Sequence, residues 1–236
     1  MNPTNDLKAW QQRAQAQTEL LLERFLPSEN EIPHTLHEAM RYAVLDGGKR
    51  LRPMLVLAAS ELGEAVHEAV EQAMAAIEMI HAYSLVHDDM PAMDNDSLRR
   101  GKPTCHIKYG EATALLVGDA LQTQAFDVLS RPTELPAARQ LAMLSVLAKA
   151  GGSAGMAGGQ AIDLANVGKQ MVQADLEQMH SLKTGALIRA AVLLGRCPAR
   201  ICLKTVWRYW TIMRQNWGWR SKSLTMCWIV KRTRRL

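Results

Sequence analysis

The sequence contains few of the residues that build β-sheets. Among its 236 residues there are only 2 Phe and 4 Tyr, whereas Met alone occurs 13 times. Aromatic and β-branched side chains favour strands, while Ala, Leu and Met favour helices. The composition therefore predicts one all-α domain with a sizeable core.

Signals for membrane insertion, export and disulfide formation are also absent. No uninterrupted apolar run reaches the roughly 18 residues that a membrane span requires. The first six residues, MNPTND, contain neither the basic nor the apolar segment of a signal peptide. The 4 cysteines lack the spacing of metal ligands and suggest a reducing compartment. We expect a cytoplasmic protein without disulfides.

Acidic residues are missing altogether from the last part of the chain. Residues 197–236 hold 10 Lys and Arg and no Asp or Glu, whereas residues 1–196 hold 18 basic and 23 acidic residues, a net charge of −5. A basic arm for nucleic acid or a membrane surface would explain this charge. However, the apolar residues of this tail follow no clear helical stripe. We therefore expect residues 1–196 to form the helical domain, the tail to be no domain, and nucleic acid not to be a partner.

Within residues 1–196 the apolar residues recur at helical spacing. The longest such stretch, 66–88, has apolar residues three and four positions apart and predicts a central helix. Glycines and prolines separate the helical stretches from one another. The pattern predicts at least seven helices and no convincing strand, with the helices at residues 6–25, 33–45, 53–62, 66–88, 111–129, 136–150 and 172–195.

A cluster of small residues lies between two of these helices. Residues 151–160 read GGSAGMAGGQ, and so much glycine is costly in a soluble helix. The cluster therefore predicts either a tight contact between helices or room for a ligand. A nucleotide-binding loop is a weaker interpretation, because no strand precedes it and no Gly-Lys-Ser/Thr follows it.

The predicted central helix runs into a loop that is first acidic and then basic. Its charged residues, in order, are Asp88, Asp89, Asp94, Asp96, Arg99, Arg100 and Lys102. Carboxylates at the end of a buried helix need compensation, and oxygen-only ligands favour Mg²⁺ or Mn²⁺ over zinc. The arginines suit phosphate groups. The loop thus indicates metal-assisted diphosphate chemistry, although the aspartates alone would fit a solvated acidic loop equally well.

Six short motifs follow one another in an order that resembles the trans-isoprenyl diphosphate synthases, and the match looks closest to the bacterial farnesyl diphosphate synthases. The resemblance covers roughly residues 5–195. The motifs are GGKRLRP at 47–53, HDDMPAMD at 87–94, LRRGKPT at 98–104, GDA at 118–120, GGQ at 158–160 and KTG at 183–185.

The resemblance implies a fold, a reaction and a set of site residues. The fold would be an isoprenoid-synthase helical bundle around a deep apolar cavity, with Mg²⁺ at its mouth. The metal would be held by Asp88 and Asp94, with Asp89 nearby as a further metal-site residue. Isopentenyl diphosphate would lie on Lys49, Arg52, His81 and Arg100. Dimethylallyl or geranyl diphosphate would face Arg99 and the catalytic residues Lys183, Thr184 and Gln160. An intact chain would be expected to form a homodimer.

The resemblance also suggests what limits product length. The residue five positions before the first Asp of the acidic motif, here Tyr83, would lie near the floor of the chain pocket. A phenol at that point should stop the product at the farnesyl chain, whereas a smaller residue would admit a longer one. A geranylgeranyl or longer-chain synthase is the nearest alternative.

The tail is where the resemblance fails. The family carries a second aspartate motif, roughly Phe-Gln-x-x-Asp-Asp-x-x-Asp, which this chain lacks. A shifted reading frame would explain the tail, because each TGG codon for Trp would then read as Leu, Met or Val. With permitted codons, residues 209–230 can be reread to include Phe-Gln-Val-Ile-Asp-Asp-Val-Leu-Asp, with the frame lost near residues 195–198. We therefore expect the last helices of the bundle to be missing and turnover to be impaired or absent.

Other classes of protein fit less of the sequence. A synthase-like subunit that pairs with an active enzyme remains an alternative. A metal phosphohydrolase built on His87 and Asp88 would need further His and Asp at helical sites and would not need the arginine pair. A terpene cyclase would share the aspartates but has no use for a second diphosphate site at Lys49 and Arg52.

Overall fold

The structure, a computed structural model, describes residues 3–45 and 47–201 of the chain. Helices account for most of this part, which confirms the predicted all-α class. They are α1 (Pro3–Phe25), α2 (His34–Val44), α3 (Leu51–Ser60), α4 (His67–Asp88), α5 (Cys105–Tyr109), α6 (Glu111–Ser130), α7 (Ala137–Gly151), α8 (Met156–Ala165), α9 (Gln173–Lys183) and α10 (Gly185–Arg196).

Helix α4 is the centre of the fold. It is buried on nearly all sides, because 14 of its 22 residues are buried, most of them Ala, Met, Val and Ile. A helix that is apolar around its whole circumference is stable only when other helices surround it. Here α6 runs beside it, α3 and α10 pack on it, and α1 and α2 also contact it. The predicted central helix is confirmed, with its last residue at Asp88 as expected.

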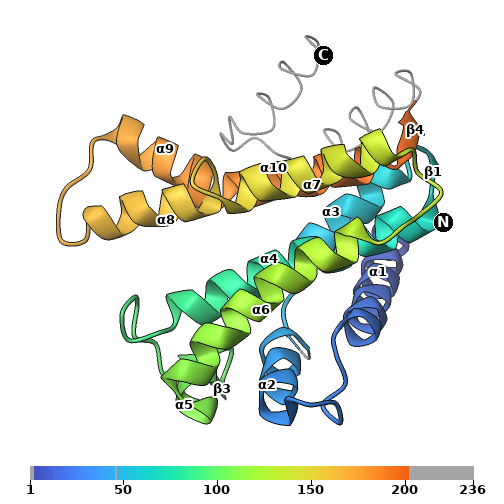
Figure 1. The fold of residues 1–236 in the computed structure, drawn as a ribbon. Coiled ribbons are helices and arrows are strands. Elements are labelled where there is room, and N and C mark those ends of the chain that lie inside the picture. The colour runs from blue at the N-terminus through green and yellow to red at the C-terminus, as the bar shows by residue number, and fades with distance from the viewer. Residues whose placement is uncertain (1–2, 46, 202–236) are drawn as a thin grey trace.

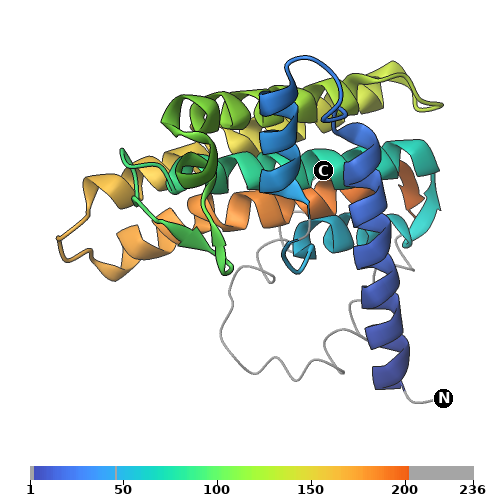
Figure 2. The ribbon, with the colours of Figure 1, turned by 90° about the horizontal axis from the view of Figure 1, so that it is seen from below.

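The helices around α4 form layers. In Figure 1, α4 and α6 cross the middle of the molecule, with α7 and α10 above them and α1 and α2 below. The view from below in Figure 2 shows α1 and α2 in front of α4. Helices α8 and α9 form a hairpin that extends beyond the other helices at one end. None of the helices in the part that the structure describes is both long and apolar enough to cross a bilayer.

Short strands, which the sequence pattern did not predict, form two antiparallel ribbons. In the first, β1 (Gly63–Ala65) pairs with β4 (Ala199–Ile201), and in the second, β2 (Leu98–Arg99) pairs with β3 (Lys102–Pro103). Strands of two or three residues are too short to show an alternating pattern. Strand β4 lies just past the predicted domain limit at residue 196. Residues 202–236, and with them most of the predicted out-of-frame tail, lie outside the described residues.

Two further predictions about helices need correction. The predicted helix at 172–195 is two helices, α9 and α10, separated at Thr184. The glycine-rich stretch, which was not assigned to a helix, contains the start of α8. A Cβ on Gly159 would overlap the backbone of Lys183 at the end of α9. Of the two interpretations of this stretch, the tight helix contact is therefore confirmed at Gly159.

Candidate functional site

The loop between α2 and α3 carries the first group of predicted site residues. Gly48 has a φ of +87°, a left-handed conformation that glycine adopts without strain. A Cβ on Gly48 would lie 2.5 Å from Nη1 of Arg100, so the guanidinium of Arg100 rests against the glycine backbone. Arg100 comes from the turn between β2 and β3. The structure thus brings Arg100, from a separate motif, to the loop that contains Lys49.

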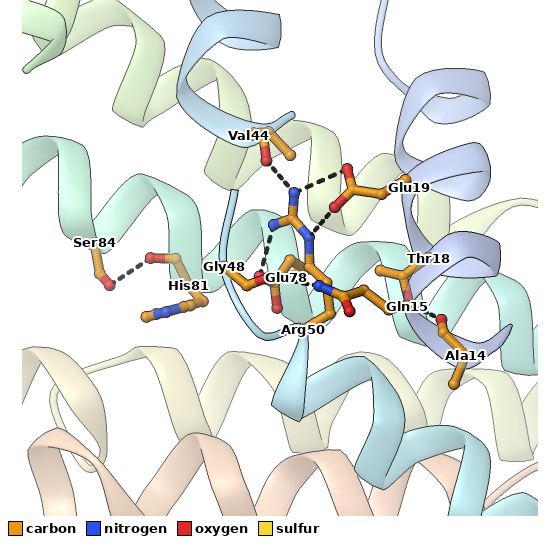
Figure 3. Close-up of polar contacts among 10 residues, drawn as sticks. All are labelled: Ala14, Gln15, Thr18, Glu19, Val44, Gly48, Arg50, Glu78, His81 and Ser84. Carbon is orange, nitrogen blue, oxygen red and sulfur yellow. Dashed lines mark hydrogen bonds and ion pairs between the residues drawn. The ribbon is translucent and has the colours of Figure 1, made fainter. Parts of the chain in front are cut away.

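Arg50 fixes this loop from the inside. Its guanidinium donates to both carboxylate oxygens of Glu19 on α1, at 2.7 and 3.0 Å, to Glu78 Oε1 on α4 at 2.9 Å, and to the Val44 carbonyl at 2.6 Å (Figure 3). Arg50 and Glu78 are each only 3% exposed. The side chain of Gln15 on α1 also donates to the Gly48 carbonyl at 3.0 Å. Helices α1, α2 and α4 therefore hold the loop together.

The two other basic residues of the loop differ in exposure. Lys49 is exposed, whereas Arg52 in the first turn of α3 is half-buried. The pKa of Arg52 is lowered, mainly by burial. The positive charge of Arg100 acts in the same direction, and the negative charge of Glu78 opposes it. The Nε of Arg52 is buried and has no hydrogen-bond partner within the described ranges. A buried cation with a free donor, beside a second arginine, is suited to bind an anion.

His81 lies on α4 one turn after Glu78 and faces these arginines. Burial is the main cause that lowers its pKa, to about 3, and the positive charges of Arg52 and Arg100 act in the same direction. The imidazole is therefore neutral at physiological pH and can take part in hydrogen bonds without adding charge. The His81 carbonyl accepts a hydrogen bond from the Ser84 hydroxyl at 2.7 Å (Figure 3).

The acidic residues lie at the end of the same helix. The Asp94 amide donates to the Asp88 carbonyl at 2.9 Å, so the loop folds back and returns Asp94 to the end of α4. Burial is the largest cause that raises the pKa of the Asp88 carboxyl, and Asp94 raises it further, while Lys183 lowers it. Within the described residues no three His, Cys, Asp or Glu side chains form a ready-made metal cluster.

Asp89 has a different environment from Asp88. It is buried, and its two carboxylate oxygens accept three hydrogen bonds from Arg99, at 2.5 to 2.8 Å. Charge-assisted pairs of this kind fix both side chains. The structure thus shows Asp89 compensated by Arg99, which makes it less available to a metal than Asp88, whose compensation is incomplete.

The predicted catalytic residues lie on the hairpin of α8 and α9. Lys183, the last residue of α9, donates from Nζ to Asp163 Oδ2 on α8 at 2.7 Å. Thr184 is exposed at the break between α9 and α10, and Gln160 is half-buried on α8. Because Lys183 also lowers the pKa of Asp88, the structure brings this hairpin close to the acidic end of α4.

Tyr83 is buried on α4, one turn before His87. The two rings make an edge contact, with their centroids 5.9 Å apart, and the His87 Nε2 lies 3.1 Å from the Leu115 carbonyl of α6. A Cβ on Gly118 would overlap the His87 ring. Tyr83 is thus part of a close contact between α4 and α6. Its position at the floor of a deep apolar cavity stays a prediction.

Three residues that hold the site were not among the predicted site residues. They are Glu19, Glu78 and Asp163, which are the carboxylate partners of Arg50 and Lys183. For Glu78 a signal existed, because a carboxylate in the middle of the apolar stretch 73–80 indicates a buried partner. Asp163, three positions after Gln160, could have been linked to Lys183 only through the fold.

The chain resembles known proteins over most of its length. The sequence profile described as Polyprenyl synthetase matches residues 33–215. The chain is 54% identical over 164 residues to the farnesyl diphosphate synthase of Escherichia coli, covering 69% of this chain and 55% of that protein. It is 48% identical over 183 residues to the farnesyl diphosphate synthase of Haemophilus influenzae, covering 76% of this chain and 62% of that protein.

A solved structure agrees with these similarities. The geranyltransferase of Legionella pneumophila aligns with a TM-score of 0.81 and 40% sequence identity, covering 86% of this chain and 73% of that one. The chain therefore shares both sequence and fold with these enzymes. It spans only 55 to 62% of the length of the two curated relatives.

Proposed function

The chain belongs to the polyprenyl synthetase family, and from this membership we propose that its site is built to condense isopentenyl diphosphate with dimethylallyl or geranyl diphosphate to farnesyl diphosphate. The observation that carries the proposal is the arrangement along α4. His81 and Asp88 are seven residues apart on α4, about 10 Å along its axis. The arginines gather near His81, and Asp94 returns to the helix end at Asp88. This spacing suits two diphosphates that meet at one reaction centre.

Each half of the site has a separate role in this proposal. Lys49 in the loop between α2 and α3 (residues 47–50, the cationic loop) binds isopentenyl diphosphate together with Arg52, His81 and Arg100. Lys183, Thr184 and Gln160 face the allylic diphosphate, and Arg99 contributes positive charge on that side while it holds Asp89 in place. The buried wall of α4 and α6 near Tyr83 receives the hydrocarbon chain and excludes water from the carbocation.

A divalent metal fits the acidic end of α4. Asp88 and Asp94 offer hard oxygen ligands, and burial and the neighbouring Asp94 raise the pKa of the Asp88 carboxyl, which a bound cation would offset. These two residues would hold Mg²⁺ or Mn²⁺, with Asp89 next to them on Arg99. When bound, the metal supplies positive charge that stabilises the leaving diphosphate.

The reaction balances without a dedicated general base. The C–O bond of the allylic diphosphate breaks, and its electron pair leaves with the diphosphate. The double bond of isopentenyl diphosphate then forms a C–C bond with the allylic cation, and one proton is lost to the released diphosphate. Lys183 and the arginines stabilise the charge that develops on the leaving group.

The oligomeric state and location follow the same proposal. Leu115 and Leu116 on α6 are 48% and 55% exposed, and such apolar side chains on a long helix could be covered by a second copy of the chain. We propose a homodimer in the cytoplasm for an intact enzyme. A non-catalytic partner subunit is the second candidate, and mixing with an intact synthase without heterodimer formation would exclude it.

Turnover is the test of this function. The purified chain is incubated with Mg²⁺, labelled isopentenyl diphosphate and dimethylallyl or geranyl diphosphate, and the product is identified. Farnesyl diphosphate is the product expected from the family. Because the second aspartate motif is expected to be lost, the present chain should show little turnover. A chain with the restored reading frame should turn over both substrates. If neither chain makes a prenyl diphosphate, the proposed function is wrong.

A further inference from the structure

Two buried polar atoms near the cationic loop lack a hydrogen-bond partner within the described residues. They are the Nε of Arg52 and the Oε2 of Glu78. An unpaired polar group in a protein interior costs free energy, so such atoms are rare and call for an explanation. One is a donor and the other an acceptor, and both belong to residues next to the same loop. They are therefore complementary to each other.

The position of Glu78 is fixed by its other oxygen. Oε1 accepts from Arg50 Nη1 at 2.9 Å, and Arg50 is itself held by Glu19 and the Val44 carbonyl (Figure 3). Because Glu78 as a whole is 3% exposed and its Oε2 is buried, water does not take the place of a partner for Oε2. Burial lowers the pKa of Arg52 and the charge of Glu78 raises it, so the two groups lie within electrostatic reach.

We propose that Glu78 is a positioning residue of the isopentenyl diphosphate site, holding Arg50 through Oε1 and accepting the Nε–H of Arg52 on Oε2 when the diphosphate binds. This inference rests on the proposed function. A guanidinium fixed through Nε keeps its two Nη groups in one plane for phosphate oxygens. The same carboxylate would offset the repulsion between Arg52 and Arg100 until the anion arrives. Glu78 thus links the rigid loop to the arginine that binds substrate.

The test uses Glu78→Gln in the full 236-residue chain. Gln has nearly the shape of Glu but lacks the charge, so the packing of α4 is kept. Calorimetric titration should show isopentenyl diphosphate bound about tenfold more weakly, the effect of losing one charge-assisted contact. Binding of geranyl diphosphate with Mg²⁺, which uses the acidic end of α4, should change by less than about twofold.

Glu71→Gln is the matched control. Glu71 lies seven residues earlier on the same helix and accepts Arg24 from α1 at 2.6 Å. Glu71 therefore joins α1 to α4 through an Arg–Glu pair that lies away from the loop between α2 and α3. Its replacement should leave both affinities unchanged. If Glu71→Gln weakens the binding of isopentenyl diphosphate as much as Glu78→Gln does, the effect comes from a general loosening of the packing between α1 and α4, and the proposal is wrong.

A double-mutant cycle with Arg52→Lys tests the route of the effect. Lys lacks the Nε–H donor of Arg, so Glu78→Gln should weaken binding much less in that background. A full tenfold loss there would contradict the proposal, as would a lower melting temperature of Glu78→Gln with unchanged affinity. If neither the unsubstituted chain nor a chain with the restored reading frame binds isopentenyl diphosphate, the proposed function fails. Normal binding by the unsubstituted chain with an unchanged affinity in Glu78→Gln overturns this inference alone.

Discussion

The charge state of His81 makes the free energy of unfolding depend on pH. Its pKa in the folded chain is about 3 against an ordinary value of 6.5, through burial and through Arg52, Arg100, Arg99 and Arg50. Between these values the unfolded chain binds a proton that the folded chain excludes. The free energy of unfolding should therefore fall as the pH is lowered below 6.5, by at most about 1.4 kcal/mol per pH unit from this group.

Replacing His81 with Asn removes the group that binds this proton in the unfolded chain. In denaturant titrations from pH 7 to 4.5, the stability of His81→Asn should decline less steeply than that of the unsubstituted chain. His67→Asn, at the exposed start of the same helix, controls for the loss of an imidazole as such. Equal slopes for His81→Asn and the unsubstituted chain would show that His81 takes up a proton in the folded state.

Tyr83 carries the prediction on product length. The ring is 8% exposed and makes an edge contact with the His87 ring. Replacing it with Ala removes most of the side-chain volume at the proposed floor of the pocket. In a catalytically active version of the chain, Tyr83→Ala should shift the product from farnesyl to geranylgeranyl or longer diphosphates. Chromatography of labelled products measures this shift, and a product that still ends at the farnesyl chain would place the floor elsewhere.

At the residue scale, the sequence was most informative where partners are close along the chain. The sequence placed Asp88 at the end of the central helix and Asp94 in the loop that follows, and the structure returns Asp94 to the end of α4. The carboxylate partners of Arg50 are 28 and 31 positions away, so no local pattern could indicate them. The roles of the predicted site residues stay predictions.

At the element scale, long amphipathic or apolar helices were predicted well and interruptions were not. Helix α6 was expected at 111–129 and spans Glu111–Ser130, because its apolar spacing is unbroken. The apolar spacing also continues through Thr184, so it could not show that α9 ends there. The break is stabilised by a tertiary contact, in which Arg189 of α10 donates to the Ser181 carbonyl of α9 at 3.0 Å.

The contact between α8 and α9 depends on a single glycine. A Cβ on Gly159 would overlap the backbone nitrogen of Lys183, and backbone atoms cannot move aside as a flexible side chain can. Gly159→Ala should therefore push α8 away from α9 and destabilise the chain by about 2 kcal/mol. It should also separate Lys183 from Asp163.

Denaturant unfolding measures this effect. Ala157→Ser, at an exposed position on the same helix, should change stability by less than about 0.5 kcal/mol. If Gly159→Ala is as stable as Ala157→Ser, the two helices do not pack as closely as the structure shows.

For the whole molecule, charge is divided unevenly between two parts of the sequence. Residues 1–196 carry a net charge of −5, and residues 197–236 carry +10 with no acidic residue. Residues 197–236 therefore supply no carboxylate to the proposed site, whose acidic residues come from the end of α4. Two carboxylates leave most positions around a Mg²⁺ ion to water and phosphate oxygens, which favours weak binding unless further ligands contribute.

Restoring the reading frame after residues 195–198 tests where those further ligands come from. The rereading predicts three additional aspartates, so the restored chain should bind geranyl diphosphate in the presence of Mg²⁺ at least about tenfold more tightly than the present chain. A chelator should remove this gain, because it depends on the metal, while binding of isopentenyl diphosphate at the cationic loop should change little. A stop codon in the shifted frame, or a restored chain with no gain in affinity, would mean that the basic tail is not a displaced aspartate motif and that Asp88 and Asp94 act without it.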